Sequence, residues 1–460
     1  MTQHGRGVVP KFRVLANWLY GVEHAETIRP TRVLSWVALT VAGTAIAFLR
    51  IPPISRNLLW AEDGRNFVAD ALAGHSFGAF FEPFAGYMHA IARLTSLLVL
   101  NFVPLARVPE AVTVTLIACT ITAGVATLAF AMLRPRMPSL LPRLAVWVGI
   151  VSSQIAVIEA NGSIANSHWY LLVGLFVVLM TRQRHAVAIA IASLVVSLTV
   201  LSDPLAGVFL PFVLVRIVAI RRFRELWVPV IFLASFTVQL SVVLGTHLSP
   251  ANSTPTLVNM LRATGFRVFL AALAGESRSS ALYAALGTVS LVGALVVVLA
   301  CLTWAALHGK NLGGLATASV ATAAVFYVFT TSIRWFPQFD SSVSTDRWRG
   351  SRYSVVPISL FFIVLSAAAG TWKGKFDSVH SDIRRCRLAL SSHRHRDPGV
   401  LRYCTISSAS MEHRAHTSTR GLPVVAARTQ YCHPHCADQL VVQDELPDNA
   451  RPSMKSSRKG

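Results

Sequence analysis

Residues 33–49 read VLSWVALTVAGTAIAFL, a run of 17 residues without a charged side chain. Such a run predicts a membrane-spanning helix, because about 20 apolar residues cross the hydrocarbon core of a bilayer. Five basic residues precede it: Arg6, Lys11, Arg13, Arg29 and Arg32. No cleavage site follows, so the helix is interpreted as retained and residues 1–32 as a cytoplasmic basic leader. The next loop is then expected on the outer face.

The composition supports a membrane protein. The chain has 460 residues, of which 53% are hydrophobic and 14% charged, whereas soluble domains carry about 25% charged residues. Its net charge of +21 does not indicate a nucleic-acid partner, since the basic residues punctuate apolar segments and no nucleic-acid-binding motif is present. Two of the six cysteines lie in apolar segments and four near the C-terminus, so no disulfide is expected.

Nine further apolar segments follow, which predicts an all-α polytopic protein with about ten spanning helices. These segments are 112–133, 143–159, 168–180, 186–201, 205–220, 227–247, 281–305, 312–332 and 353–372. The arginine-rich connections between them then fall on the cytoplasmic side, and the long loops 50–111, 248–280 and 333–352 on the outer side. The segment 89–103 is interpreted as an interfacial helix, because a span there would move Arg134, Arg136 and Arg143 outside.

These segments divide the chain into three parts. The leader is followed by a transmembrane domain at 33–375, whose first outer loop covers about 50–111. From 376 to 460 the sequence is rich in Arg, Ser and His without helical or strand periodicity, which predicts a disordered cytoplasmic tail. An abrupt change of this kind would also follow from a shifted reading frame. The Cys432–Cys436 sequence CHPHC contains zinc-type ligands but lacks a second pair at the usual spacing.

The first outer loop carries the most informative polar residues. The stretch 59–93 reads LWAEDGRNFVADALAGHSFGAFFEPFAGYMHAIAR and contains the adjacent carboxylates Glu62 and Asp63. Asp63 also suits a simple helix cap. Other polar clusters fall on the same predicted face, and include Arg65, Tyr87, His89, Arg93, Glu159, Asn166, His168, Trp169, Asp203, Arg347, Arg349, Arg352 and Tyr353. Individually, these residues could serve as helix caps, interfacial anchors or lipid-headgroup contacts.

Together they indicate a transfer reaction at a membrane surface. A carboxylate there can act as general base toward an acceptor hydroxyl, which assigns Asp63 as the base and Glu62 as a supporting or metal-binding carboxylate. Arginines stabilise a phosphate leaving group, which suits Arg349 and Arg352, with Arg65 and Arg93 nearby. The candidate residues for the sugar or acceptor are Tyr87, His89, Asn166, His168, Trp169 and Tyr353. Glu62 and Asp63 could also hold Mg²⁺ or Mn²⁺.

This arrangement resembles the GT-C class of polytopic membrane glycosyltransferases, including bacterial members. That class carries an acidic motif and interfacial helices in the first outer loop, matched here by Glu62-Asp63 and the segments 67–80 and 89–103. The Arg352-Tyr353 pair that opens the last helix is also similar. The resemblance covers roughly 33–372, but the loop has no Asp-x-Asp sequence and no large C-terminal outer domain follows.

The resemblance implies transfer of a sugar from a polyprenyl-phosphate donor to an extracytoplasmic envelope glycan or lipid. It also implies a multi-pass protein of the plasma membrane, with cytoplasmic termini and an active face outside. Two other functions stay open: a transporter or flippase of a lipid-linked anionic substrate, and a noncatalytic envelope assembly protein. Polar residues of a transporter usually lie at mid-membrane, whereas those found here flank the apolar segments.

Overall fold

The computed structural model describes eleven segments of the chain: 14–15, 17–20, 30–73, 77–102, 110–153, 159–183, 185–219, 223–246, 255–308, 312–333 and 350–371. All of them belong to one compact unit, Met1–Lys373. The predicted tail at 376–460, together with Arg347 and Arg349, lies outside the described residues. Every regular element of the described segments is a helix, and the β-type pairing there is an isolated bridge between Phe84 and Tyr87.

The expected fold class is confirmed: the described part of the chain is an all-α polytopic membrane protein. Seven of its helices are long and apolar enough to cross a membrane. Six of them overlap predicted spans, namely α2 (Pro30–Arg50), α6 (Glu110–Met132), α11 (Trp227–Gly245), α14 (Thr288–His308), α15 (Gly313–Ile333) and the final span Ser351–Thr371. The prediction for α14 is wrong at its start, expected at residue 281, because the preceding helix continues to Leu286 and ends at Gly287, where φ is 54°. The final span opens with the 3-10 turn η8 (Ser351–Ser354).

The other four predicted spans are shorter apolar helices. They are α7 (Leu140–Val151), α8 (Ser167–Leu179), α9 (Ala186–Val200), and the turn η4 (Pro204–Phe209) continued by α10 (Leu210–Ala219). The prediction for α7 is wrong at its C-terminal end, which was expected at residue 159. The guanidinium of Arg50 accounts for part of this early ending, because it donates to the carbonyls of Val151 at 3.0 Å and Ser153 at 2.8 Å. Residues 154–158 lie outside the described part.

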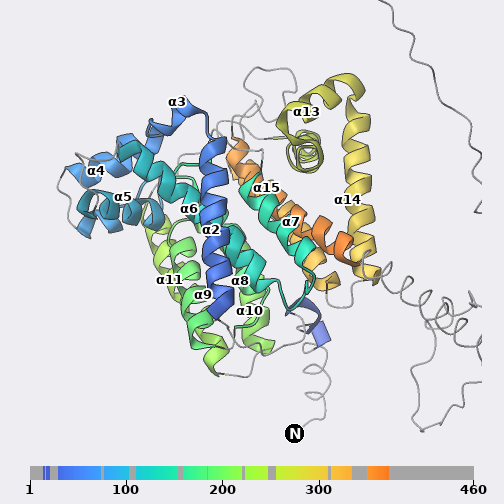
Figure 1. The fold of residues 1–460 in the computed structure, drawn as a ribbon, viewed down its shortest axis with the longest axis horizontal. Helices are drawn as coiled ribbons and strands as arrows, with labels where there is room; N and C mark the ends of the chain where they lie inside the picture. Colours follow the sequence, from blue (N-terminus) through green and yellow to red (C-terminus); the bar gives the residue numbers. More distant parts are fainter. Residues whose placement is uncertain are drawn as a thin grey trace, which may run out of the picture. The chain divides into compact units, whose positions relative to one another are not determined.

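The seventh long apolar helix, Leu257–Glu276, lies where the sequence predicted an outer loop. It combines α12 (Leu257–Thr264), the π-helical turn η6 (Gly265–Leu270) and the start of α13 (Ala271–Leu286). Figure 1 shows part of this region end-on, whereas α2 and α14 run across the view. α12 exposes apolar side chains, and η6 packs against α14. The mean hydropathy of the segment equals that of α15, although Asn259, Arg262 and Arg267 interrupt its apolar runs.

The core is organised around α8, all 13 residues of which are buried. It packs against α6 and α9, and large apolar side chains on α2, α11 and α14 point outward from the described bundle. Soluble monomers rarely expose so much contiguous apolar surface, so these outward faces are the ones that meet lipid. We call the end of the bundle where α8 begins the carboxylate end, and the end where α8 finishes the arginine end.

The connection from α2 to α6 holds five short helical elements at the carboxylate end. These are α3 (Pro53–Arg56), η2 (Asp63–Val68), α4 (Ala69–Leu72), η3 (Phe77–Phe81) and α5 (Ala90–Phe102). The predicted interfacial helix at 89–103 corresponds to α5. The predicted helix at 67–80 is wrong as one continuous element, because it is divided among η2, α4 and η3. Figure 1 shows α3, α4 and α5 gathered beside the C-terminal end of α2.

The expected leader is partly structured. Residues 14–15 and 17–20 are helical, and Leu19 and Tyr20 are buried in the main hydrophobic core. The hydroxyl of Tyr20 donates a hydrogen bond of 2.7 Å to the carbonyl of Phe212 in α10. These contacts anchor the segment before α2 to the bundle. The sequence had described this segment only by its positive charge, so the contacts were not predicted.

Candidate functional site

Asp63 lies at the centre of the carboxylate end and is 0% exposed. Its Oδ1 accepts hydrogen bonds from the backbone N–H of Ala165 at 2.8 Å and from the hydroxyl of Ser163 at 3.2 Å. Its Oδ2 accepts one from the N–H of Ile164 at 3.1 Å. The carboxylate therefore joins the first loop to the turn that precedes α8. It does not cap its own helix, so the simple cap interpretation is wrong.

Burial dominates the ionisation of Asp63. Desolvation raises the pKa of this carboxyl from 3.8 to about 7, against the opposing effect of the hydrogen bonds from Ala165, Ser163 and Ile164. The neighbouring charge of Glu62 raises the pKa further. A carboxyl with a pKa close to neutrality can hold or release a proton at physiological pH, which is a property of acid–base groups in active sites.

Glu62 differs from its neighbour in that part of its carboxylate is uncommitted. Its Oε2 is buried and has no hydrogen-bond partner among the described residues, although the side chain as a whole is half-buried. The preceding residue, Ala61, has a φ of 22°, which a residue with a side chain rarely adopts. Backbone strain of this kind recurs at functional sites, where it fixes the direction of a reactive side chain.

Glu159 holds the start of the final span. Its Oε1 accepts from the N–H of Gly350 at 2.8 Å, and its Oε2 accepts from the N–H of Arg352 at 3.2 Å and the hydroxyl of Ser351 at 3.4 Å. A carboxylate at a helix N-terminus satisfies free backbone donors and suits the helix dipole. Glu159 thereby fixes the backbone of Arg352, and the two side chains also interact electrostatically.

Arg352 is the cation of this site and connects its two acidic elements. The guanidinium interacts electrostatically with Glu159 and Glu62, and lies 5.5 Å from the ring centroid of Tyr353. A second cation, Arg267 of η6, is buried and also interacts electrostatically with Glu159. The sequence did not identify Arg267, because it falls in the segment expected to be a loop. A basic residue inside an apolar run was the available signal.

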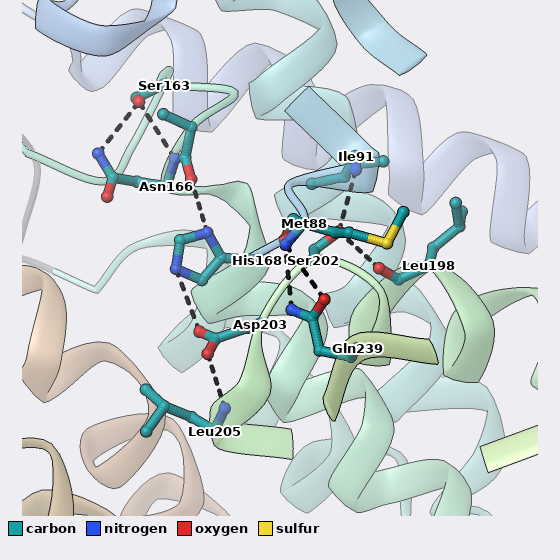
Figure 2. A network of polar contacts seen from close by, with 11 residues as sticks. Met88, Ile91, Ser163, Asn166, His168, Leu198, Ser202, Asp203, Leu205 and Gln239 are labelled. Atoms are coloured by element: carbon teal, nitrogen blue, oxygen red, sulfur yellow. Dashed lines mark hydrogen bonds and ion pairs between the residues drawn. The ribbon is translucent and has the colours of Figure 1, made fainter. Parts of the chain in front are cut away.

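His168 and Asp203 form a second buried pair beside the carboxylates (Figure 2). The Nδ1 of His168 lies 2.6 Å from the carbonyl oxygen of Ala165, so it carries a hydrogen and donates. The Nε2 lies 3.2 Å from Oδ2 of Asp203, so the imidazole and the carboxylate form a close polar pair. Oδ1 of Asp203 accepts from the N–H of Leu205, so this residue also caps η4, as one interpretation of the sequence expected.

The segment 86–91 of the first loop is fixed to the bundle through its backbone (Figure 2). The N–H of Met88 donates to Oε1 of Gln239 in α11 at 3.1 Å, and the amide of Gln239 donates back to the Met88 carbonyl at 3.4 Å. The N–H of Ile91 donates to the hydroxyl of Ser202 at 2.9 Å, and the hydroxyl of Thr246 donates to the Gly86 carbonyl at 2.7 Å. This attachment fixes the backbone that carries Tyr87 and His89.

Aromatic rings line the region between the first loop and α8. The ring of His89 lies 4.2 Å from that of Tyr87 and 5.9 Å from that of His168, measured between centroids. Trp169 lies 4.9 Å from His168 and 5.1 Å from Tyr353. The indole N–H of Trp169 is buried without an acceptor among the described residues. The structure therefore brings together five predicted sugar-binding residues from three separate parts of the chain.

Three other described residues that were predicted for the site do not join the group of aromatic rings and carboxylates. Arg93 is buried, pairs with Asp70 at 2.6 Å and lies over the ring of Phe67 at 5.2 Å, so its charge is used within the first loop. Arg65 is exposed on η2. The amide of Asn166 donates to the carbonyl of Glu159 at 2.7 Å and to Ser163, which makes it part of the turn structure. Arg349 lies outside the described residues.

No group of three or more His, Cys, Asp or Glu side chains in the described segments could hold a metal ion. Both carboxylate oxygens of Asp63 already accept hydrogen bonds, from the hydroxyl of Ser163 and the N–H groups of Ala165 and Ile164, whereas Oε2 of Glu62 accepts none from the described residues.

The fold and the site together define a polytopic helical membrane protein with a carboxylate–arginine cluster where the helices end. Comparison with protein-family models, with curated proteins and with solved structures gave no match.

Proposed function

We propose that this protein is a membrane glycosyltransferase of the GT-C type, acting on a polyprenyl-phosphate-linked sugar. One observation carries the proposal: Glu62, with an uncommitted buried oxygen, and Arg352 interact at the same end of the bundle. Sugar transfer from a lipid phosphate needs a base for the acceptor hydroxyl and a cation for the leaving phosphate. The aromatic rings beside this pair suit the apolar faces of a sugar.

The reaction would form a bond between the acceptor oxygen and the anomeric carbon of the sugar. The bond between that carbon and the phosphate oxygen breaks, and its electron pair leaves with the polyprenyl phosphate. The proton of the acceptor hydroxyl passes to a carboxylate of the site. Arg352 and Arg267 stabilise the charge that develops on the phosphate, since both are held near Glu159.

The geometry favours Glu62 as the base and Asp63 as a positioning residue. From the sequence alone, Asp63 was predicted to be the base and Glu62 the supporting carboxylate. Asp63 is fully buried and accepts three hydrogen bonds from the turn before α8, whereas Oε2 of Glu62 accepts none from the described residues. Asp63 then fixes its neighbour against this turn, and its raised pKa makes that support dependent on pH.

The proposal includes a location and a set of partners. The charge pattern of the sequence favours the extracytoplasmic side of the plasma membrane for the carboxylate end. The donor is a polyprenyl-phosphate sugar that enters from the lipid, and the acceptor is an envelope glycan or lipid. Membrane lipids surround the outward apolar faces of α2, α11 and α14.

The test uses three variants in a deletion strain. Glu62→Gln removes the proposed base, Asp63→Asn removes the positioning charge, and Glu82→Gln is the matched control because Glu82 is an exposed acid of the same loop. The envelope glycan profile should return with wild type and Glu82→Gln and stay defective with Glu62→Gln. Normal glycan in the Glu62→Gln strain, at wild-type protein levels, would exclude Glu62 as the base.

A transporter of a lipid-linked anion is the second candidate, and one observation favours it. The buried Arg267 lies in the π-helical turn η6, and α13 is interrupted at Gly275, where φ is 76° and ψ 169°. Interrupted helices with buried charges are typical of transport sites. The purified protein in detergent distinguishes the two, because a transferase still converts donor and acceptor where no membrane separates them, and a transporter does not.

A further inference from the structure

A groove opens between α2 and α6 on the outward, lipid-facing side of the bundle. It has a volume of about 500 Å³ and is lined by α2 from Thr40 to Leu49 and by Leu116 and Thr120 of α6. None of the side chains that the proposed transfer reaction uses lines it. Its wall includes exposed residues such as Ala45 and Leu49, so the groove is accessible from the membrane.

The groove follows from short side chains where the two helices meet. A Cβ added at Gly43 would lie 2.9 Å from the Cβ of Ala123, so the two backbones approach closely there. Beside this contact, the hydroxyl groups of Thr44 and Thr120 lie 3.4 Å apart. Phe48, one turn beyond Thr44, carries a much larger side chain, and this difference in length leaves a hollow between the helices.

The polar atoms of the groove are satisfied within the helices themselves. The hydroxyls of Thr40, Thr44 and Thr120 each donate to the carbonyl four residues earlier, at 3.0, 2.9 and 2.8 Å respectively. Their hydrogens are therefore not offered to a ligand, and the groove presents methyl groups and apolar side chains. Such a surface suits a hydrocarbon chain better than a sugar or a peptide.

The length and position of the groove match one leaflet of a bilayer. From Thr40 to Leu49 it extends roughly 14 Å along α2. This is about half of the hydrocarbon core, which is about 30 Å thick. The groove ends near the C-terminus of α2, where α3 and the rest of the first loop begin. A single acyl chain of the leaflet at the carboxylate end therefore fits along it.

A cation lies at this end of the groove. Nη2 of Arg56 in α3 donates to the carbonyl of Leu49 at 2.7 Å, and Nε donates to that of Ile51 at 2.8 Å. The guanidinium carbon lies 5.1 Å from the ring centroid of Phe48. These contacts fix the charge beside two residues that line the groove.

The charge of Arg56 is available to a ligand. The side chain is half-buried, and it forms no ion pair with a carboxylate of the described residues. Its third nitrogen, Nη1, donates to none of these residues and is not buried. A guanidinium placed at the headgroup level with a free N–H group attracts phosphate oxygens.

We propose that the groove and Arg56 together bind one anionic phospholipid. An acyl chain lies in the groove between α2 and α6, and an oxygen of the headgroup phosphate accepts a hydrogen bond from Nη1 of Arg56. A negative headgroup is favoured over a zwitterionic one, because the net charge of the lipid then complements that of the arginine. The bound lipid joins α3 to the two spanning helices, and its binding is independent of the proposed transfer reaction.

The experiment is native mass spectrometry of the purified full chain in detergent, which counts both bound lipids and protein copies. The probes are phosphatidylglycerol and phosphatidylcholine with identical acyl chains, and undecaprenyl phosphate. Wild type should bind one phosphatidylglycerol about fivefold more tightly than phosphatidylcholine, which is the effect of one arginine at a membrane surface. Undecaprenyl phosphate should not displace phosphatidylglycerol at equal concentration.

Two pairs of variants test the groove and the cation separately. Ala45→Phe fills the groove and should weaken both phospholipids by about tenfold or more, since the burial of roughly two CH₂ groups carries that difference. Ala42→Phe is the matched control, because Ala42 is an exposed alanine of α2 outside the groove. Arg56→Gln should abolish the preference for phosphatidylglycerol and Arg56→Lys should retain part of it. Arg65→Gln removes an exposed charge of the same loop and should bind as wild type.

Four results would overturn the proposal. Equal affinity of wild type for the two phospholipids removes the role of the cation, and equal affinity of Ala45→Phe and Ala42→Phe removes that of the groove. Displacement of phosphatidylglycerol by undecaprenyl phosphate in wild type, but not in Ala45→Phe, assigns the groove to a polyprenyl chain. A two-copy species that Ala45→Phe abolishes assigns the groove to an interface between copies of this chain.

Discussion

The raised pKa of Asp63 predicts a specific dependence of folding stability on pH. In the unfolded chain this carboxyl titrates near 3.8, whereas in the folded protein its pKa is about 7. Between these values the folded state binds one proton more than the unfolded state. Stability from this group is therefore full below the unfolded pKa and is lost as the pH rises through the folded pKa.

The size of the effect follows from the two pKa values. One pKa unit corresponds to about 1.4 kcal/mol, so raising the pH from about 5.5 to about 8 should remove roughly 2 kcal/mol through Asp63 alone. For a chain of this length, that difference shifts the unfolding temperature by roughly 2–4 °C. Every other titrating group contributes as well, so the quantity of interest is the difference between wild type and Asp63→Asn.

The assay is thermal unfolding of both proteins in one detergent over this pH range. The Asn variant cannot titrate at position 63, so the stability of wild type relative to the variant should decline as the pH rises to about 7 and level off above it. Glu82→Gln supplies the control, because Glu82 is exposed and its removal should leave the pH profile of wild type unchanged. A wild-type-to-variant difference that is constant from pH 5.5 to 8 would refute the assignment of a raised pKa to Asp63.

Three further predictions concern the support of the site. Glu159→Gln should reduce transferase activity by about tenfold or more at unchanged membrane levels, since an amide cannot accept from both Gly350 and Arg352; wild-type turnover in purified membranes would contradict this. Gly162→Ala should destabilise the protein by about 1–3 kcal/mol, because φ is +85° and the new Cβ meets Ile51, whereas Gly124→Ala, with open space, should not. Gln239→Ala should increase hydrogen exchange in 86–91, and unchanged exchange there would show that its bonds to Met88 are dispensable.

Hydropathy predicted most of the helices because a helix that crosses a bilayer must be both long and apolar, and both properties can be read from the sequence. The final span was predicted at 353–372 and is found at Ser351–Thr371, and the first was predicted at 33–49 and is found at Pro30–Arg50. The same averaging could not detect the early end of α7, which coincides with a tertiary contact from Arg50. The prediction also missed the Leu257–Glu276 helix, because charged residues interrupt its apolar runs, although its mean hydropathy equals that of α15.

The sequence predicted several of the residues that gather at the carboxylate end, but not the contacts between them. Placing charged and aromatic residues on one predicted face brought Asp63 near the turn at 163–165, and the structure brings these elements into hydrogen bonding. No local pattern indicates that Glu159 holds a helix start 191 residues away. Nor does spacing show that Arg93 is neutralised by Asp70, because that pair depends on how η2, α4 and α5 fold together.

The most direct measurement is the ratio of lipid-linked sugar to finished envelope glycan in the deletion strain, determined by mass spectrometry. Strains complemented with wild type, Glu62→Gln or Glu82→Gln should be compared at equal protein levels. If Glu62 is the base, the Glu62→Gln strain accumulates polyprenyl-phosphate sugar and lacks one glycan residue, while the Glu82→Gln strain matches wild type. Equal ratios in all three strains would contradict the assignment of sugar transfer to the carboxylate end.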